Sequence, residues 1–303
     1  MTATAVGALL IILLGVVIRR LGIAGPKDGP LLVRLVINLF LPALIFDILL
    51  RADLSGSLLL VPAAGWIIYF SLLALCVALT RSLRLDGPRA GAFIVAGAVG
   101  NTGFFGLPLV AASGSHFSQA AAVMYDALCT GIVTWTATPA LAKGYGGTGP
   151  RLEWRPLLRA LALPPSWAVV AGLGLNLAGV NDLPDVLDRP LELLGGAVLP
   201  LVMIYAGLLL ELGALRWIWG QVAAIAGVRL LIAALVGLGV AVLLGLHGAN
   251  LNTVVVMAAM PTAMMSLVLG TQFGLRSDVL AVSVATTTLL ATLTLPAIRA
   301  LLL

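Results

Sequence analysis

The chain has 303 residues, of which 61% are hydrophobic and only 10% are charged, and its formal net charge is +5. About a quarter of the residues are charged in a soluble domain, so this composition excludes an ordinary soluble protein. The mean hydropathy of +1.14 indicates an integral membrane protein instead. Its apolar runs are continuous rather than alternating, which favours transmembrane helices over a β-barrel.

Ten apolar runs predict an all-α polytopic membrane protein with ten transmembrane helices. The predicted spans are 4–23, 30–50, 57–80, 90–112, 118–142, 165–181, 190–210, 219–246, 250–272 and 278–302. Basic residues gather in the loops after odd-numbered spans, namely Arg19, Arg20, Lys27, Arg81, Arg84, Arg89, Lys143, Arg151, Arg155, Arg159, Arg216 and Arg276. The loops after even-numbered spans contain only Arg51 and Arg189. Because cytoplasmic loops carry the positive excess, we expect a multi-pass protein of the cell inner (plasma) membrane with both termini on the outer side.

Span 2 holds two ionisable residues, although a charge at the bilayer centre costs at least ~2.5 kcal/mol. Arg34 lies one turn inside the span and can extend to the cytoplasmic interface. Asp47 lies near the outer end, five residues after Pro42. Two interpretations of Asp47 stay open: a carboxylate that faces a central cavity, or an interfacial carboxylate.

Spans 4 and 9 contain residues that a regular helix does not favour. Span 4 has GAVGNTGFFGLP over residues 97–108, and span 9 has AAMPTAMMS over residues 258–266. Backbone groups at such breaks need partners from protein, ligand or water. We expect both spans to be broken and to cross at mid-membrane, where two half-helix N-termini favour an anion. Close packing of small residues and a simple proline kink are the structural alternatives.

The predicted substrate-binding residues lie at these two breaks. They are Gly100, Asn101, Thr102, Gly103, Pro261, Thr262 and Ser266. Asn101 and Thr102 are expected to hydrogen-bond the substrate, while the glycines free the backbone. Pro261 is expected to break span 9.

Asp126 in span 5 and Arg229 in span 8 are the most deeply placed charges. They either form a buried ion pair or act separately, Asp126 as a proton-carrying carboxylate and Arg229 as a cation that attracts the anion. No carboxylate lies in span 4 or span 9, which favours proton-coupled or uncoupled transport over sodium coupling. We expect no metal and no other cofactor.

Residues 144–164 form the longest connection and divide the chain into residues 1–143, with spans 1–5, and residues 165–303, with spans 6–10. Arg151, Arg155 and Arg159 recur at helical spacing among apolar residues. This pattern predicts a cytoplasmic linker with an amphipathic helix on the lipid surface. A regulatory or partner-binding segment is the alternative.

The two halves share features at a nearly constant offset. Leu41-Pro42 matches Leu199-Pro200 at an offset of 158, Pro139 matches Pro296 at 157, and Gly114 matches Gly274 at 160. Because each half has an odd number of spans, the second half is inverted relative to the first. An inverted five-plus-five repeat is typical of secondary transporters.

An intramembrane enzyme is the competing class. Tyr125-Asp126 supplies only half of the motif pair of intramembrane aspartyl proteases. His116 and His247 are isolated, so the His-Glu-x-x-His pattern of a zinc protease is missing from the sequence. We therefore expect no enzyme activity, and a channel or receptor would not require matched breaks in inverted halves.

Three motifs resemble the auxin efflux carrier family: residues 38–46, residues 100–108, and residues 258–266 followed by Gly274-Leu275. The family includes bacterial malonate and malate carriers and the plant PIN-formed auxin transporters, and it is related to bile-acid sodium symporters. This chain lacks the large central hydrophilic loop of the long plant members, so it looks like the short bacterial type. The resemblance implies a scaffold of spans 1, 2, 6 and 7, a mobile core of spans 3–5 and 8–10, and an elevator-like motion. It also implies that Asn101 and Pro261 flank the substrate.

The sequence therefore predicts a secondary transporter, for efflux or uptake, of a small organic anion such as a mono- or dicarboxylate or an auxin-like acid. A sodium-coupled organic anion symporter is the alternative. The expected partners are the substrate and the lipid bilayer, with no nucleic acid. Assembly into a homodimer is left open.

Overall fold

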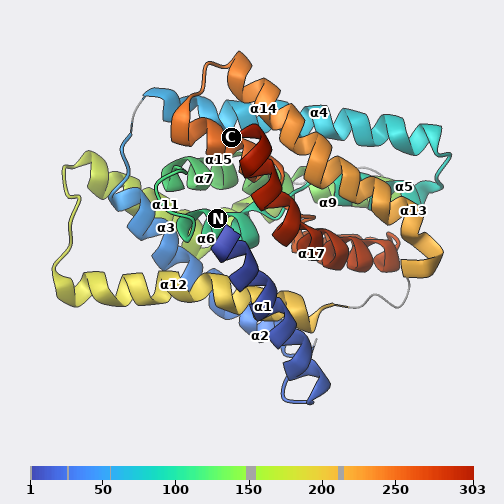
Figure 1. Cartoon of the computed structure of the whole chain (residues 1–303), viewed down its shortest axis with the longest axis horizontal. Coiled ribbons are helices and arrows are strands. Elements are labelled where there is room, and N and C mark those ends of the chain that lie inside the picture. The colour runs from blue at the N-terminus through green and yellow to red at the C-terminus, as the bar shows by residue number, and fades with distance from the viewer. Residues whose placement is uncertain (1, 26, 55, 148–154, 211–214) are drawn as a thin grey trace.

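The computed structural model describes residues 2–25, 27–54, 56–147, 155–210 and 215–303. Over these residues the chain is helical, apart from loops and one isolated antiparallel bridge (Figure 1). In chain order the helices are α1 (Thr2–Arg20), α2 (Gly29–Leu35), η1 (Val36–Phe40), α3 (Leu41–Leu50), η2 (Gly56–Leu60), α4 (Val61–Ser82), α5 (Gly87–Ala98), η3 (Thr102–Gly106), α6 (Leu107–Ala111), α7 (Gln119–Tyr125), η4 (Asp126–Thr130), α8 (Gly131–Trp135), α9 (Ala137–Tyr145), α10 (Arg155–Leu161), α11 (Pro164–Leu177), α12 (Asp185–Leu208), α13 (Leu215–Ala226), η5 (Gly227–Ile232), α14 (Ala233–Leu243), α15 (Gly248–Ala258), α16 (Met264–Gln272) and α17 (Ser277–Leu302).

In the described part of the chain, six helical segments are long and apolar enough to cross a membrane. They are Gly29–Leu50, Gly56–Ser82, Gln119–Tyr145, Asp185–Leu208, Ile218–Leu243 and Ser277–Leu302, which fall on predicted spans 2, 3, 5, 7, 8 and 10. The other predicted spans correspond to α1, to the shorter α11 and to the interrupted segments α5–α6 and α15–α16. The structure therefore confirms a helical multi-pass membrane protein, while the count of ten crossings stays a prediction.

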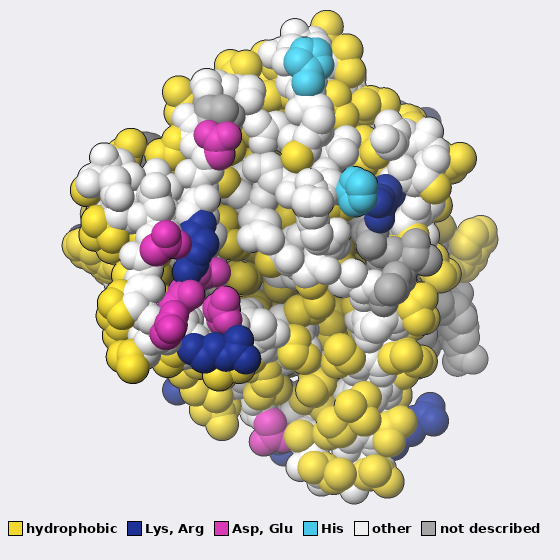
Figure 2. Space-filling view, turned by 60° about the vertical axis from the view of Figure 1, so that its left-hand side comes forward, with side chains coloured by type: hydrophobic (Ala, Val, Ile, Leu, Met, Phe, Trp, Pro, Cys, Tyr) yellow, Lys and Arg dark blue, Asp and Glu magenta, His cyan; other side chains and the backbone are white. Residues whose placement is uncertain are grey.

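The surface fits a lipid environment. Large apolar side chains are exposed on several helices, among them Leu10, Leu243 and Leu293. Figure 2 shows a face with wide hydrophobic areas, on which acidic and basic side chains gather mainly in one part. A soluble monomer rarely exposes apolar surface this extensive, so much of this surface is suited to contact with acyl chains.

One group of helices consists of α1, α3, α11 and α12. α1 and α3 both pack against α12, and α11 packs against α3. α1 and α12 approach closely because each has a glycine at the contact. A Cβ added to Gly15 would lie 2.4 Å from the carbonyl oxygen of Ile204, and one added to Gly207 would lie 2.2 Å from that of Ile12. These helices cover predicted spans 1, 2, 6 and 7.

The second group contains α4, α5, α7, α9 and α13–α17, which pack on one another in the larger part of the molecule. In Figure 1, α3, α11 and α12 occupy the left side, whereas α4, α5 and α13 extend to the right. The two groups are therefore offset along the long axis.

Two prolines explain the π-helical turns η1 and η3. Pro42 and Pro108 each stand second in an α-helix, and a π-helical turn, η1 or η3, comes directly before each of those helices. A proline ring clashes with the carbonyl four residues earlier, here that of Asn38 or Phe104. A wider turn at that point relieves the clash.

Candidate binding site at the helix crossing

The structure has breaks at both predicted places, and the two breaks are in direct contact. Residues 99–101 separate α5 from η3, and residues 259–263 separate α15 from α16. Gly100 and Thr262 form the isolated antiparallel bridge between them. The segments thus satisfy part of each other's backbone at a depth where water is excluded.

Two backbone hydrogen bonds flank this bridge. The N–H of Asn101 donates to the carbonyl of Pro261 at 2.7 Å, and the N–H of Ala263 donates to the carbonyl of Val99 at 3.0 Å. The bridged residues are 262 − 100 = 162 positions apart, close to the offsets on which the predicted repeat rests. The donors Asn101 and Ala263 are separated by the same offset as the bridged residues, and so are the acceptors Val99 and Pro261. A local two-fold axis through the bridge would produce this relation.

Arg229 caps the ends of both interrupted helices. It lies in η5 and is only 2% exposed. Its Nε donates to the carbonyl of Met260 at 2.8 Å, its Nη1 donates to those of Gly97 at 3.3 Å and Ala98 at 3.2 Å, and its Nη2 donates to that of Ala258. The last carbonyls of a helix lack intrahelical donors and form the negative end of its dipole. One buried cation therefore stabilises the C-terminal ends of α5 and α15 together.

Of the two alternatives for Asp126 and Arg229, the ion pair does not form, because the guanidinium donates to these carbonyls. Among the described residues, the hydrogen bond to the Asp126 carboxylate comes from the hydroxyl of Thr102, at 2.5 Å. Arg229 also does not line the large cavity described next, so the structure does not support its expected role as an anion-attracting cation. A Cβ on Gly100 would come within 2.9 Å of Nη2 of Arg229, which explains the glycine at this position.

An open cavity lies beside the crossing and has an empty volume of about 1000 Å³, including its mouth. Its polar end is formed by residues 100–103 and by Asp126. Asp126 is the one charged side chain among the described residues that line it. The cavity extends from the crossing to the linker, where Leu161 and Ser166 line its other end.

Most of the remaining wall is apolar. Ile37, Leu41 and Ile45 face the cavity from η1 and α3, Phe104 from η3 and Trp135 from α8. A ligand in this cavity therefore meets a cluster of hydrogen-bonding groups at residues 100–103 and Asp126, and a mostly apolar wall with a few hydroxyl groups over the rest of its surface.

Several donors at the polar end, on buried or half-buried residues, have no acceptor in the described chain. The side-chain amide nitrogen of Asn101 has no partner, although the residue is only 3% exposed. The backbone N–H groups of Thr102, Gly103 and Phe104 also lack acceptors, because they belong to the first turn of the ten-residue helix formed by η3 and α6. Because these residues all line the cavity, their donors offer a place that suits a negatively charged group.

Three of the predicted binding residues do not line this cavity: Pro261, Thr262 and Ser266. Thr262 holds the crossing together, since its hydroxyl donates to the carbonyl of Ala96 at 3.0 Å and its N–H donates to the hydroxyl of Thr287 at 3.0 Å. Ser266 is 1% exposed and its hydroxyl has no partner in the described chain. Gly100, Asn101, Thr102 and Gly103 are the predicted residues that the structure brings together with Asp126.

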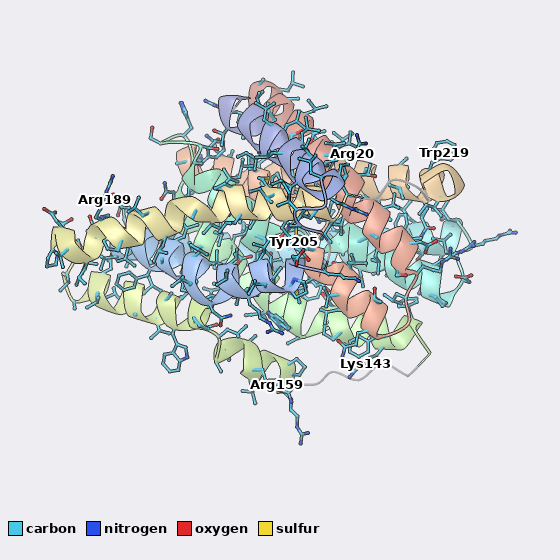
Figure 3. All side chains as sticks on the ribbon, turned by 90° about the horizontal axis from the view of Figure 1, so that it is seen from below. Arg20, Lys143, Arg159, Arg189, Tyr205 and Trp219 are labelled. Atoms are coloured by element: carbon cyan, nitrogen blue, oxygen red, sulfur yellow. The ribbon has the colours of Figure 1, made fainter. Side chains whose placement is uncertain are left out.

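Asp47 lies outside the cavity. It pairs with Arg51 one turn later on the chain, and Arg51 also pairs with Asp188 at the start of α12. This ion network joins α3 to α12 near the end of the molecule where Figure 3 shows Arg189. Of the two interpretations of Asp47, the structure agrees with the carboxylate outside the cavity.

The sequence reasoning missed two threonines on the cavity wall. Thr130 and Thr134 line it together with Asp126. They stand four and eight residues after Asp126, which places all three on one face of a helix. That spacing was the available signal.

The linker also contributes to the wall, which was not expected. α10 lies within the predicted amphipathic segment, and Arg155 and Arg159 are exposed on it. Figure 3 shows Arg159 pointing away from the body of the molecule. Arg151 lies outside the described residues. The apolar side of the linker borders the cavity through Ala160 and Leu161.

A family model described as membrane transport protein matches residues 2–147 and 153–299. The chain is 34% identical over 299 residues to an uncharacterized transporter of Methanothermobacter thermautotrophicus, covering 97% of this chain and 96% of that protein. It is 27% identical over 290 residues to an uncharacterized transporter of Methanocaldococcus jannaschii, covering 92% of each.

Proposed function

Because the chain belongs to the membrane transport protein family, the auxin efflux carrier family that its motifs resemble, we propose that it is a secondary transporter of a small organic anion bound at the helix crossing. Family and relatives are transporters, so the protein is a multi-pass membrane transporter and not an enzyme. The anion class, the site and the mechanism are the proposal.

The unpaired donors at the crossing carry this proposal. A buried donor without an acceptor costs about 1–3 kcal/mol, and the side-chain amide of Asn101 is such a donor. Three neighbouring N–H groups at a helix start are free as well. A carboxylate offers two acceptor oxygens to this set, and the positive end of the helix dipole favours its charge.

The apolar wall determines which kind of group can be attached to the substrate carboxylate. Side chains such as Ile45, Phe104 and Trp135 favour a hydrocarbon or aromatic body over a second charged group. No cation lines the cavity in the described chain, so a second carboxylate would find no partner of opposite charge. Within the expected class of mono- or dicarboxylates and auxin-like acids, the lining favours a monocarboxylate with an apolar body.

An elevator-type movement of one helix group along the other is the mechanism that we propose. The offset between the two groups in Figure 1 agrees with such a displacement. The inverted repeat that would provide the opposite state is supported by Gly114 and Gly274, which follow α6 and α16 with φ of +79° and +80°. The cavity reaches the linker, on the side predicted to be cytoplasmic, and we propose that the described state is open to that side.

A ligand-stabilisation screen tests the proposal. We expect benzoate or indole-3-acetate to raise the melting temperature of the purified protein more than the dicarboxylate malonate does, while the matched amides benzamide and indole-3-acetamide do not raise it. Asn101→Ala should melt like the wild type and lose the shift, because its side-chain amide binds only the ligand. A panel in which no acid stabilises the wild type would contradict the proposal. Repeating the screen with K⁺ in place of Na⁺ separates the sodium-coupled alternative.

A further inference from the structure

We propose that Asp126 holds one proton when the anion is bound, so that a monocarboxylate and a proton enter the site as an electrically neutral pair. This inference rests on the proposed function, because it requires an anion at the crossing. The inference adds to the proposed function the identity of the coupling ion, a proton, and of the side chain that carries it, Asp126.

The first observation is how closely the carboxyl group of Asp126 approaches the free donors. It accepts a hydrogen bond of 2.5 Å from the hydroxyl of Thr102, the first residue of η3. A Cβ on Gly103 would lie 3.2 Å from both carboxyl oxygens. The carboxyl group therefore lies against the same helix turn whose N–H groups would bind the substrate.

A bound carboxylate and an ionised Asp126 would repel each other at this distance. At a separation of about 4 Å and an effective dielectric constant of about 20, their repulsion weakens binding by about a thousandfold. An ionised Asp126 would thus offset much of the binding free energy that the N–H groups at the start of η3 and the side-chain amide of Asn101 provide. A protonated Asp126 removes the repulsion and adds a donor.

Among the described residues around Asp126, none supplies a cation that could take the place of the proton. On its own helix the neighbouring titratable groups are Tyr125 and Cys129, both buried. Across a small cavity behind Thr102, α4 contributes Tyr69 and η5 contributes Arg229. The guanidinium of Arg229 is held by carbonyls of α5 and α15, as described above.

The other described elements that line the cavity with Asp126 contribute uncharged residues to it. η1 and α3 present Ile37, Leu41 and Ile45, and the residues after α10 present Ser166. A proton is therefore the charge that can balance the anion here.

The proposed step has a simple balance. One proton joins a carboxyl oxygen of Asp126, and its O–H donates to one oxygen of the substrate carboxylate. The Thr102 hydroxyl keeps its hydrogen bond to the other side of the Asp126 group. No covalent bond of the substrate changes. When the substrate is released on the opposite side of the membrane, the proton leaves Asp126 and enters the solution on that side.

Calorimetric titration of the purified protein with benzoate and with indole-3-acetate tests this inference. The range is about pH 6.5 to about pH 9, where both probes are ionised. In the wild type we expect the affinity to fall by up to about tenfold per pH unit, with uptake of about one proton on binding. Buffers of different ionisation enthalpy measure that uptake directly.

Substitutions assign the proton to a residue. Asp126→Asn mimics the protonated carboxyl group, so its affinity should not change with pH and its binding should take up no proton. Asp126→Glu is the matched control that keeps a titrating group, and its binding should keep a pH dependence. If Asp126→Asn does not fold, Thr102→Val should move the pH at which affinity falls, whereas Thr102→Ser should leave it in place.

The outcomes separate this inference from the proposed function. Binding by the wild type that is flat with pH and takes up no proton would overturn the inference and leave the anion site standing. A pH dependence that persists in Asp126→Asn, or is unmoved in Thr102→Val, would also overturn it. If neither probe binds the wild type, the proposed function itself fails.

Discussion

At the residue scale, the crossing depends on a charge that makes no ion pair. The donors of Arg229 go to four carbonyls from two helix ends, and its side chain is buried. A planar guanidinium suits this task because its donors point in fixed, divergent directions. The sequence revealed a costly charge in span 8, but not its partners, since these depend on where two distant helices stop.

We expect Arg229→Lys to destabilise the protein by at least about 3 kcal/mol, because one ammonium cannot serve carbonyls on both helices and each orphaned carbonyl costs about 1–3 kcal/mol. The check is the thermal unfolding of the detergent-purified protein. Arg159→Lys on the exposed face of α10 is the matched control and should melt like the wild type. A wild-type melting temperature for Arg229→Lys would refute the capping role.

At the residue level, the sequence indicated which neighbouring residues line the cavity where the pattern was local, while their role in binding stays a prediction. Gly100, Asn101, Thr102 and Gly103 stand next to one another in a motif that cannot continue a helix, and all four reach the cavity. Pro261 and Thr262 were assigned by the same logic, yet their groups hold the crossing together from the other side. Which side of a bridge faces a cavity is decided by tertiary packing.

At the element scale, glycine and proline indicated the breaks in spans 4 and 9 because both residue types weaken a helix in the bilayer. The contact between the breaks was expected, but its form as a backbone bridge was not. The sequence was a poorer guide to which residues of a helix share the face that lines the cavity. Thr130 and Thr134 share the face of Asp126, and the role of the linker as a cavity wall follows from packing between α10 and α8.

The close contact of α1 with α12 gives a prediction at this scale. Gly207→Ala places a Cβ 2.2 Å from the carbonyl oxygen of Ile12, so the helices must separate, at a cost of about 1–3 kcal/mol. Gly196→Ala on the same helix meets nothing within 4 Å and should be neutral or slightly stabilising. Thermal unfolding of the two variants compares them. Equal melting temperatures would show that the contact does not limit how closely the helices pack.

At the scale of the whole molecule, the labelled basic residues are spread along the long axis, and Arg159, predicted to be cytoplasmic, lies near its middle in Figure 3. In Figure 3, Arg189 lies at one end of the long axis, and Arg20, Lys143 and Trp219 lie toward the other. Arg189 belongs to the predicted outer side, and Arg20 and Lys143 to the predicted cytoplasmic side. The location in the inner (plasma) membrane, the outer position of both termini and a homodimeric assembly stay predictions.

The direction in which the cavity opens can be tested by cysteine labelling. The native Cys76 and Cys129 are buried, so a membrane-impermeant maleimide should report an introduced thiol. Thr134→Cys lines the cavity and should be labelled from the linker side in the absence of substrate. Arg189→Cys is exposed at the opposite end and should be labelled from the outer side alone. Labelling of Thr134→Cys from the outer side alone would reverse the assigned orientation.

The central claim, an organic anion carried through a site centred on Asn101, is tested most directly by counterflow in proteoliposomes. Vesicles are loaded with the acid that stabilises the protein most strongly in the screen, and the labelled form is added outside. We predict transient accumulation of label by the wild type and none by Asn101→Ala, although that variant melts like the wild type because its amide makes no hydrogen bond in the described chain. Counterflow at the wild-type level in Asn101→Ala would contradict the account.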